Sequence, residues 1–329
     1  MNDNVRAVSG VVVVLGTGGT IAGVSDTGHD RDYQAAQLGV DQLVAAVPSL
    51  AGQPLEAYQV AQVDSKDMGW PVWRALLIAL DEALARPDVA GVVVTHGTVT
   101  LEETAWLLHL LLPPGKPVVL TAAMRPATSS EADGPRNLAD AVRVVRWAAA
   151  AEEDAVLAVL NGRVWAGTEV RKAHSWHIDA FDGGGVPPLA LVEGDQVLPT
   201  PDAVWAEPRG QLSAALIGLE ALPRVEIITS HADADGSLVE ALLAASNREG
   251  AKPLRGIVVA CTGHGTWHQD LEAALLKARR AGVVVWRASR VARGGIESQP
   301  GETWPVAGRL TPAQARVALT VTLALRDTA

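Results

Sequence analysis

The stretch that decides the fold is Val11-Val12-Val13-Val14-Leu15-Gly16-Thr17-Gly18-Gly19-Thr20-Ile21-Ala22-Gly23. It opens with five apolar residues, four of them β-branched, which predicts a strand buried on both faces. The glycines that follow allow a sharp backbone turn and a close approach to a neighbouring group. Ligands bind at the carboxyl ends of the strands in an open parallel sheet. The loop with Thr17 and Thr20 is therefore predicted to border a binding site.

This loop matches neither of the common phosphate-binding patterns. A dinucleotide-binding loop needs a third glycine where this chain has Ile21, and a Walker A loop would end in Gly-Lys-Ser or Gly-Lys-Thr. Two interpretations stay open from this segment alone. The loop is either a tight turn without chemistry or a loop that presents a threonine hydroxyl as a nucleophile.

A second apolar strand pattern, residues 91–95, leads into the polar segment 96–104. Strand patterns alternate with helical patterns along the rest of the chain, and this alternation predicts βαβ units. Two helix starts carry capping-box patterns, one at Thr100 and one at Thr311. The predicted fold class is α/β with two domains, each a mainly parallel sheet flanked by helices.

The length of 329 residues favours two domains over one compact core. The segment 199–222 contains prolines and has weak periodicity, which is typical of a linker. We therefore expect a larger N-terminal catalytic domain over residues 1–198 and a smaller C-terminal α/β domain over residues 223–329.

Charge and hydropathy limit the partners and the location of the protein. The chain has 27 Lys and Arg against 37 Asp and Glu, a net charge of −10, and no basic cluster, so it is not expected to bind nucleic acid. No uninterrupted apolar run reaches the ~18 residues of a membrane span. Residues 1–10 lack the apolar segment of a signal peptide. We expect a cytoplasmic protein whose partners are small molecules and copies of itself.

The glycine- and threonine-containing segments resemble the bacterial-type L-asparaginase/glutaminase family. The signature T-G-G-T-I-A-G is present from Thr17 to Gly23, and H-G-T-D-T-x-E-E-T is present from His96 to Thr104 with Val99 in place of the aspartate. The resemblance runs from about residue 11 to the C-terminus. Further matches are Ser65–Met68, Ala123–Pro126, Ala132–Pro135, Asn137–Leu138 and Val170–Lys172.

This resemblance implies amide hydrolysis through a covalent acyl-threonine and assigns four catalytic residues. Thr20 stands at the position of the nucleophile, and Tyr33 lies in the polar segment 25–34, which matches a mobile lid of the family. Thr98 faces the substrate from the opposite side, and Lys172 is the candidate base. A lysine accepts a proton only when it is neutral, so burial or a neighbouring positive charge must lower its pKa.

The departure at Val99 concerns substrate binding. In the family the aspartate holds the substrate's α-ammonium and joins Thr98 and Lys172 in a triad, while the position of Ser65 holds the α-carboxylate. Lys66 stands where the family commonly has glutamine. Losing a charge-assisted hydrogen bond costs about 1.5–3 kcal/mol. Val99 is therefore expected either to inactivate the site or to suit an amide without an α-ammonium. Without reference to the family, packing at a strand end also explains a valine at this position.

The resulting expectation is an amidohydrolase without cofactor or metal that releases ammonia from L-asparagine or a related monoamide. The alternative is a catalytically impaired family member that binds a small carboxylic acid or amide. His174 with His177 and His264 with His268 have suitable spacing for a metal but lack the acidic or cysteine ligands of a zinc site.

The resemblance also implies an assembly. The family forms homotetramers, built as dimers of dimers, in which the second domain completes a neighbour's active site. The segment 263–266 and either Glu297 or Glu302 are the residues expected to reach that neighbouring site.

Overall fold

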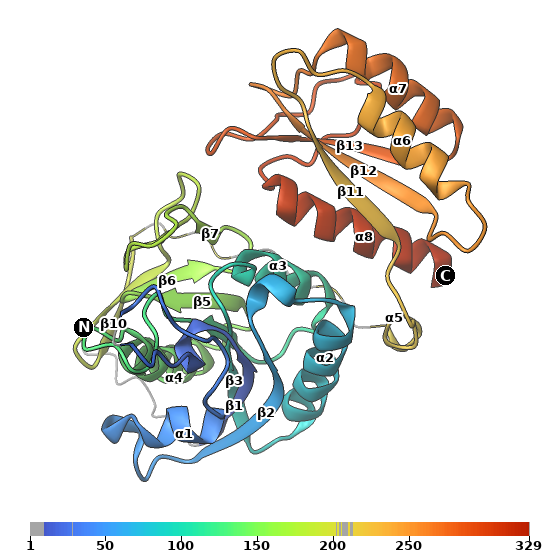
Figure 1. The fold of residues 1–329 in the computed structure, drawn as a ribbon. Coiled ribbons are helices and arrows are strands. Elements are labelled where there is room, and N and C mark those ends of the chain that lie inside the picture. The colour runs from blue at the N-terminus through green and yellow to red at the C-terminus, as the bar shows by residue number, and fades with distance from the viewer. Residues whose placement is uncertain are drawn as a thin grey trace. The chain divides into compact units, whose positions relative to one another are not determined.

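The computed structural model describes residues 10–27, 29–201, 203, 205, 210 and 213–328. The chain divides into two compact units, residues 1–213 and 214–329, whose elements are labelled in Figure 1. The division lies inside the segment 199–222, for which the sequence predicts a linker.

The N-terminal unit is built on an eight-stranded sheet with the order β10-β9-β6-β5-β4-β3-β1-β2. The strands from β5 to β2 pair in parallel, and β6, β9 and β10 add an antiparallel edge. Because β1 and β3 are parallel neighbours, the loops that follow them meet at one edge of the sheet. The strands are β1 (Val11–Gly18), β2 (Leu55–Val63), β3 (Val89–Thr95), β4 (Val118–Thr121), β5 (Val156–Leu160), β6 (Arg163–Ala166), β9 (Ala190–Glu193) and β10 (Gln196–Pro199).

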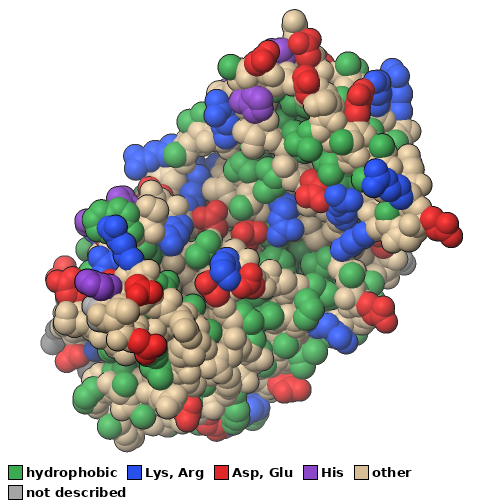
Figure 2. Space-filling view, in the orientation of Figure 1, with side chains coloured by type: hydrophobic (Ala, Val, Ile, Leu, Met, Phe, Trp, Pro, Cys, Tyr) green, Lys and Arg blue, Asp and Glu red, His purple; other side chains and the backbone are tan. Residues whose placement is uncertain are grey.

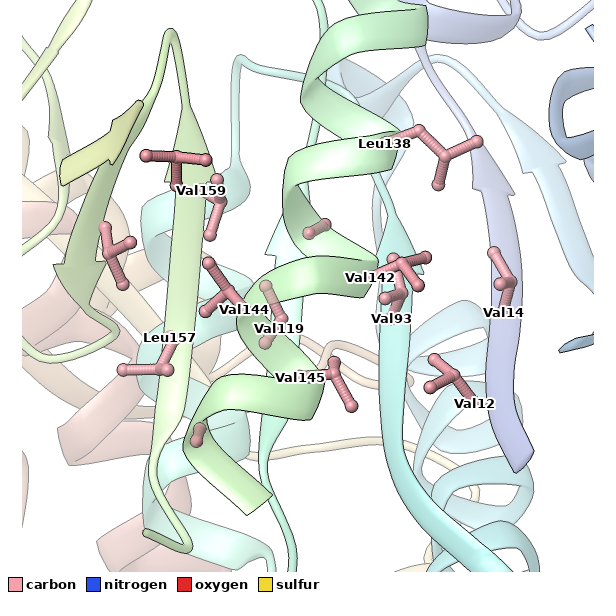
Figure 3. Close-up of a cluster of buried hydrophobic side chains, with 14 of the residues drawn as sticks. Val12, Val14, Val93, Val119, Leu138, Val142, Val144, Val145, Leu157 and Val159 are labelled. Carbon is pink, nitrogen blue, oxygen red and sulfur yellow. The ribbon is translucent and has the colours of Figure 1, made fainter. Parts of the chain in front are cut away.

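Strand β1 is buried along almost its whole length, as predicted, because it lies between β2 and β3 inside the sheet. Helix α4 (Gly134–Ala150) covers one face of this sheet and directs Leu138 and Val142 toward strand side chains such as Val14 and Val93 (Figure 3). Burying each such side chain contributes about 1.5–3 kcal/mol. This packing fixes the strand and hence the position of the loop at its carboxyl end.

The other helices of this unit are α1 (Val40–Ala45), α2 (Trp70–Ala85) and α3 (Leu101–Leu111). Three short 3₁₀ turns lie at Thr20–Ala22, Pro48–Leu50 and Ser65–Asp67. The helices alternate with the parallel strands, so the predicted βαβ arrangement is confirmed.

The capping box predicted at Thr100 is wrong, whereas the one at Thr311 is confirmed. Thr100 is the N-cap of α3, but its side chain caps no backbone N–H; its Oγ1 donates to the carbonyl oxygen of Ser65 at 2.8 Å. At the start of α8 (Pro312–Thr328), Thr311 Oγ1 accepts from Gln314 N and Gln314 Oε1 accepts from Thr311 N, at 3.1 and 3.0 Å. A partner distant in sequence thus outcompetes the local bond at Thr100.

The C-terminal unit contains a parallel sheet with the order β11-β12-β13. Helices α6 and α7 pack on one face of it and α8 on the other (Figure 1). The strands are β11 (Arg224–Thr229), β12 (Leu254–Cys261) and β13 (Val284–Ser289), and the helices are α5 (Ala214–Ile217), α6 (Ser237–Ser246), α7 (Gln269–Arg280) and α8. Together with the first unit, this confirms the predicted two-domain α/β fold.

The strands that the sequence analysis did not predict lie after β5. A turn at Asn161 and Gly162, with φ of 49° and 70°, reverses the chain into β6, because a two-residue hairpin loop of this kind needs positive φ at both positions. Beyond it lie β9, β10 and the two-residue pair β7 (Arg171–Lys172) and β8 (Phe181–Asp182). Such short strands carry too few residues for a periodic pattern.

Acidic and basic side chains are both spread over the molecular face shown in Figure 2. Among the described residues, none of the helices combines the length and the apolar character needed to cross a membrane.

Candidate active site

The loop after β1 contacts the loop after β3 through glycines. Gly18 and Gly19 have φ of 104° and 84°, a region that favours glycine. A Cβ at Gly19 would overlap Gly97, and a Cβ at Gly97 would overlap the Ser65 side chain. The glycines are therefore required for three polar loops to approach one another at this edge of the sheet.

The two threonines of the first loop have different surroundings. Thr17 Oγ1 is buried and donates to the carbonyl oxygen of Thr95 at 2.9 Å, so its hydroxyl is a structural link between β1 and β3. Thr20 begins the 3₁₀ turn, and its Oγ1 lies 2.7 Å from the hydroxyl of Tyr33. Thr17 is thus a structural residue, whereas the hydroxyl of Thr20 faces the hydroxyl of Tyr33.

Thr98 and Lys172 meet although 74 residues separate them. Lys172 Nζ lies 2.8 Å from Thr98 Oγ1, and the backbone N–H of Lys172 donates to Glu102 Oε2 at 2.9 Å. Burial lowers the pKa of Lys172, while the carboxylate of Asp64 acts in the opposite direction. Of the two causes that the sequence analysis allowed, burial is the one that operates here.

These groups border a single cavity of about 410 Å³, within the usual range of small-molecule sites. Its lining is Thr20, Asp30, Arg31, Tyr33, Thr98, Val99, Met124, Arg125, Lys172, Ser175 and Trp176. Val99 is 54% exposed, so the explanation of this residue by packing at a strand end is wrong.

Two of the predicted binding residues lie outside this lining. Ser65 is buried, and its Oγ accepts from the N–H of Val99 at 3.2 Å. The Lys66 ammonium forms ion pairs with Asp64, at 3.7 Å, and with Asp67. Ser65 thus contacts the backbone of Val99 and does not line the cavity. The ammonium of Lys66 is paired with carboxylates close to it in the sequence.

Arg125 joins two segments that border the cavity. Its Nε lies 3.1 Å from Asp30 Oδ2, and its Nη1 donates to the carbonyl oxygen of Trp176 at 2.9 Å. The guanidinium of Arg31 lies 5.2 Å from the centroid of the Trp176 ring. The polar segment predicted as a lid is therefore held against the loop that follows β7.

Comparison with known families agrees with this geometry. Residues 11–204 match the family described as "Asparaginase, N-terminal", and residues 224–329 match the "Glutaminase/Asparaginase C-terminal domain". The chain belongs to the asparaginase family.

Individual members of the asparaginase family align along most of the chain. L-asparaginase 2 of Escherichia coli K12 is 34% identical over 322 residues, which cover 95% of this chain and 88% of that protein. Glutaminase-asparaginase of Pseudomonas fluorescens biotype A is 35% identical over 324 residues, covering 95% and 86%. The crystal structure of a probable cytoplasmic L-asparaginase from Campylobacter jejuni is similar with a TM-score of 0.85 at 33% identity and covers 95% of each chain.

A half-buried carboxylate holds the loop of this asparaginase-family chain that carries Met124 and Arg125. Asp133 accepts hydrogen bonds from the N–H groups of Met124 and Arg125, at 2.9–3.1 Å, and from the side-chain amide of Asn137 at 3.1 Å. Asn137 also donates to the carbonyl oxygen of Ala122. The sequence analysis noted this segment as a family match without assigning it a role. The available signal for such a role was the position of Asp133 directly before the first residue of a helix.

We expect Asp133→Ala to destabilise the N-terminal unit by about 2–4 kcal/mol, because it leaves several half-buried N–H donors without an acceptor. The same change should lower amidase activity by displacing Arg125. Urea unfolding and ammonia release measure the two effects. Asp195→Ala is the control: Asp195 pairs with Arg143 but its side chain is 98% exposed, so its loss should cost less than about 1 kcal/mol. Equal stability of the two variants would contradict this role of Asp133.

His96 of the second signature has a structural role. It is fully buried, its Nδ1 lies 2.7 Å from the carbonyl oxygen of Gly97, and its Nε2 lies 3.0 Å from Thr104 Oγ1, which accepts from the indole N–H of Trp73. Burial lowers the pKa of His96 to about 4. The imidazole is therefore neutral at pH 7, donates from Nδ1, and fixes the loop that carries Thr98.

The two histidine pairs with a spacing suitable for a metal have backbone partners instead. His174 Nδ1 accepts from the N–H of His177, His268 Nδ1 accepts from the N–H of Asp270, and His264 Nε2 accepts from the N–H of Glu297. No group of three metal-binding side chains is found among the described residues.

Proposed function

We propose that this chain hydrolyses a small side-chain amide, L-asparagine or a related monoamide, to a carboxylate and ammonia. Family membership makes it an asparaginase-like hydrolase, since the similar proteins are named L-asparaginase and glutaminase-asparaginase. The observation that carries the proposal is the pairing of Lys172 Nζ with Thr98 Oγ1 in the cavity that also holds Thr20 and Tyr33. Ammonia release from L-asparagine and from its deaminated analogue tests it.

The proposed first step forms a covalent acyl-threonine. Thr20 Oγ1 attacks the amide carbonyl carbon as its proton passes to the adjacent oxygen of Tyr33, 2.7 Å away, and the hydroxyl proton of Tyr33 passes on to the amide nitrogen. The C–N bond then breaks, and ammonia leaves with one added proton. Water attacks the resulting ester, the threonine hydroxyl is restored, and the carboxylate product leaves.

Thr98 and Lys172 form the second pair, which we assign to proton transfer. A neutral Lys172 accepts a proton from Thr98, and Thr98 in turn deprotonates the water that attacks the acyl ester. The burial that lowers the pKa of Lys172 supports this role, because the neutral form of the amine is then reached at a lower pH. The comparisons give no support to the alternative of an impaired family member that only binds its ligand.

The location and the assembly are extensions of the proposal. We infer a cytoplasmic protein, which agrees with the similar structure from Campylobacter jejuni, a probable cytoplasmic enzyme. We also infer a homotetramer of two close dimers, in which residues 263–266 and Glu297 or Glu302 approach a neighbour's cavity. Closed symmetry of this kind is common in soluble oligomers.

Sedimentation equilibrium of the full chain is expected to give the mass of four chains at micromolar concentration. A mutation at the proposed shared site, Glu297→Ala or Glu302→Ala, should then reduce turnover without changing the mass. A monomer at the concentration used for the activity assay would contradict both the tetramer and the shared site.

A further inference from the structure

The charged side chains that line the cavity are mostly cationic. Arg31, Arg125 and Lys172 border it, and Asp30 is the carboxylate among the described lining residues. Asp30 is already paired with Arg125 at 3.1 Å. When Lys172 is neutral, two guanidinium groups still face one paired carboxylate. The described part of the lining that this chain contributes therefore offers a substrate ammonium no unpaired carboxylate, so a carboxylate for that role would have to come from the neighbouring subunit.

Val99 makes the same part of the cavity apolar. Its side chain lines the cavity and is accessible, while its backbone N–H is bonded to Ser65 Oγ. An ammonium held against the valine methyl groups would lose water without gaining a hydrogen-bond acceptor, and an unpaired buried charge is costly. A methylene group of a substrate would instead bury apolar surface against Val99, and removing apolar surface from water is favourable.

Arg31 gives a substrate carboxylate a partner. Its guanidinium carbon lies over the Trp176 ring, 5.2 Å from the centroid, and among the described residues no carboxylate is within ion-pair distance of it. A guanidinium can bind a carboxylate through two parallel N–H···O bonds.

We propose that the site prefers ω-monoamides of dicarboxylic acids that lack an α-ammonium, with the carboxylate on Arg31 and the chain carbons beside Val99. Succinamic acid, which is L-asparagine without its amino group, is the simplest such substrate. This inference rests on the proposed function, because the amide end of the substrate is placed between Thr20 and Thr98.

Ammonia release from three amides tests the preference. Succinamate carries only a carboxylate, L-asparagine carries a carboxylate and an ammonium, and butanamide carries neither. The full chain is expected to show a kcat/KM for succinamate at least tenfold above that for L-asparagine. Hydrolysis of L-asparagine as fast as succinamate would overturn the preference and leave the proposed function intact, whereas no ammonia from any of the amides would overturn the proposed function.

Equilibrium binding separates specificity from catalysis. Calorimetry on the Thr20→Ala variant should give a Kd for succinate at least tenfold below that for L-aspartate. Equal affinities would contradict the inference even if the chemistry follows another route.

Two variants assign the preference to residues. Arg31→Gln should raise KM for succinamate at least tenfold more than KM for butanamide, and Arg280→Gln on the exposed end of α7 is the matched control that should alter neither. Val99→Asp should raise kcat/KM for L-asparagine at least tenfold and lower it for succinamate. If Val99→Asp and the unmodified chain hydrolyse L-asparagine equally, position 99 does not control ammonium recognition.

Discussion

Thr20→Ala is expected to lower kcat for amide hydrolysis by a factor of about 10³ or more, because it removes the hydroxyl proposed to form the acyl intermediate. The unfolding free energy should fall by less than about 1.5 kcal/mol, since the bond to Tyr33 is the one hydrogen bond of this hydroxyl within the described part of the chain. Steady-state ammonia release and urea unfolding of the same preparation measure the two quantities.

Thr17→Val provides the matched control, because it removes a hydroxyl from the same loop. The Thr17 hydroxyl bonds the carbonyl oxygen of Thr95, so this variant should lose about 1 kcal/mol of stability and keep its turnover within threefold. Wild-type turnover by Thr20→Ala would make Thr98 the candidate nucleophile.

Lys172→Met is the second change with a large expected effect. The thioether fills the space of the lysine side chain but accepts no proton, so kcat/KM should fall by a factor of about 10²–10⁴. Lys172→Arg should not restore activity, because the guanidinium stays charged and cannot act as a base. Recovery of activity in Lys172→Arg would show that the site needs a positive charge at this position.

The pH profile gives a sharper test of the same role. Burial disfavours the charged lysine, so kcat/KM should rise with pH through an apparent pKa below 10.5 as Lys172 loses its proton. Asp64 opposes this shift, so Asp64→Asn should move the rising limb to lower pH. Lys116→Met, a change at another lysine whose pKa burial lowers, should leave the limb in place. A limb that persists unchanged in Lys172→Met would exclude the lysine as the base.

The fold was predictable where local patterns are long. The buried strand β1 and the 16-residue helix α2 follow directly from apolar runs and helical spacing. The capping boxes show the limit of such patterns: Thr311 uses its local partner, but Thr100 bonds the carbonyl oxygen of Ser65, which the chain brings beside it only after folding.

The site was predictable in part for the same reason. Thr20, Thr98 and Lys172 stand in signature segments, but their geometry depends on the sheet order, which places β1 beside β3. Arg125 and Trp176 were missed, because they come from loops 51 residues apart and their contact is formed by a backbone carbonyl that has no sequence signal.

The central claim is that Thr20 and Thr98 act together in amide hydrolysis. The most direct measurement compares ammonia release from succinamate and L-asparagine by the unmodified chain, Thr20→Ala and Thr98→Ala, each normalised to folded protein. The account predicts one ammonia per carboxylate product from the unmodified chain and a loss of at least about a hundredfold in both variants. Absence of ammonia from the unmodified chain with either amide, or wild-type rates in both variants, would contradict it.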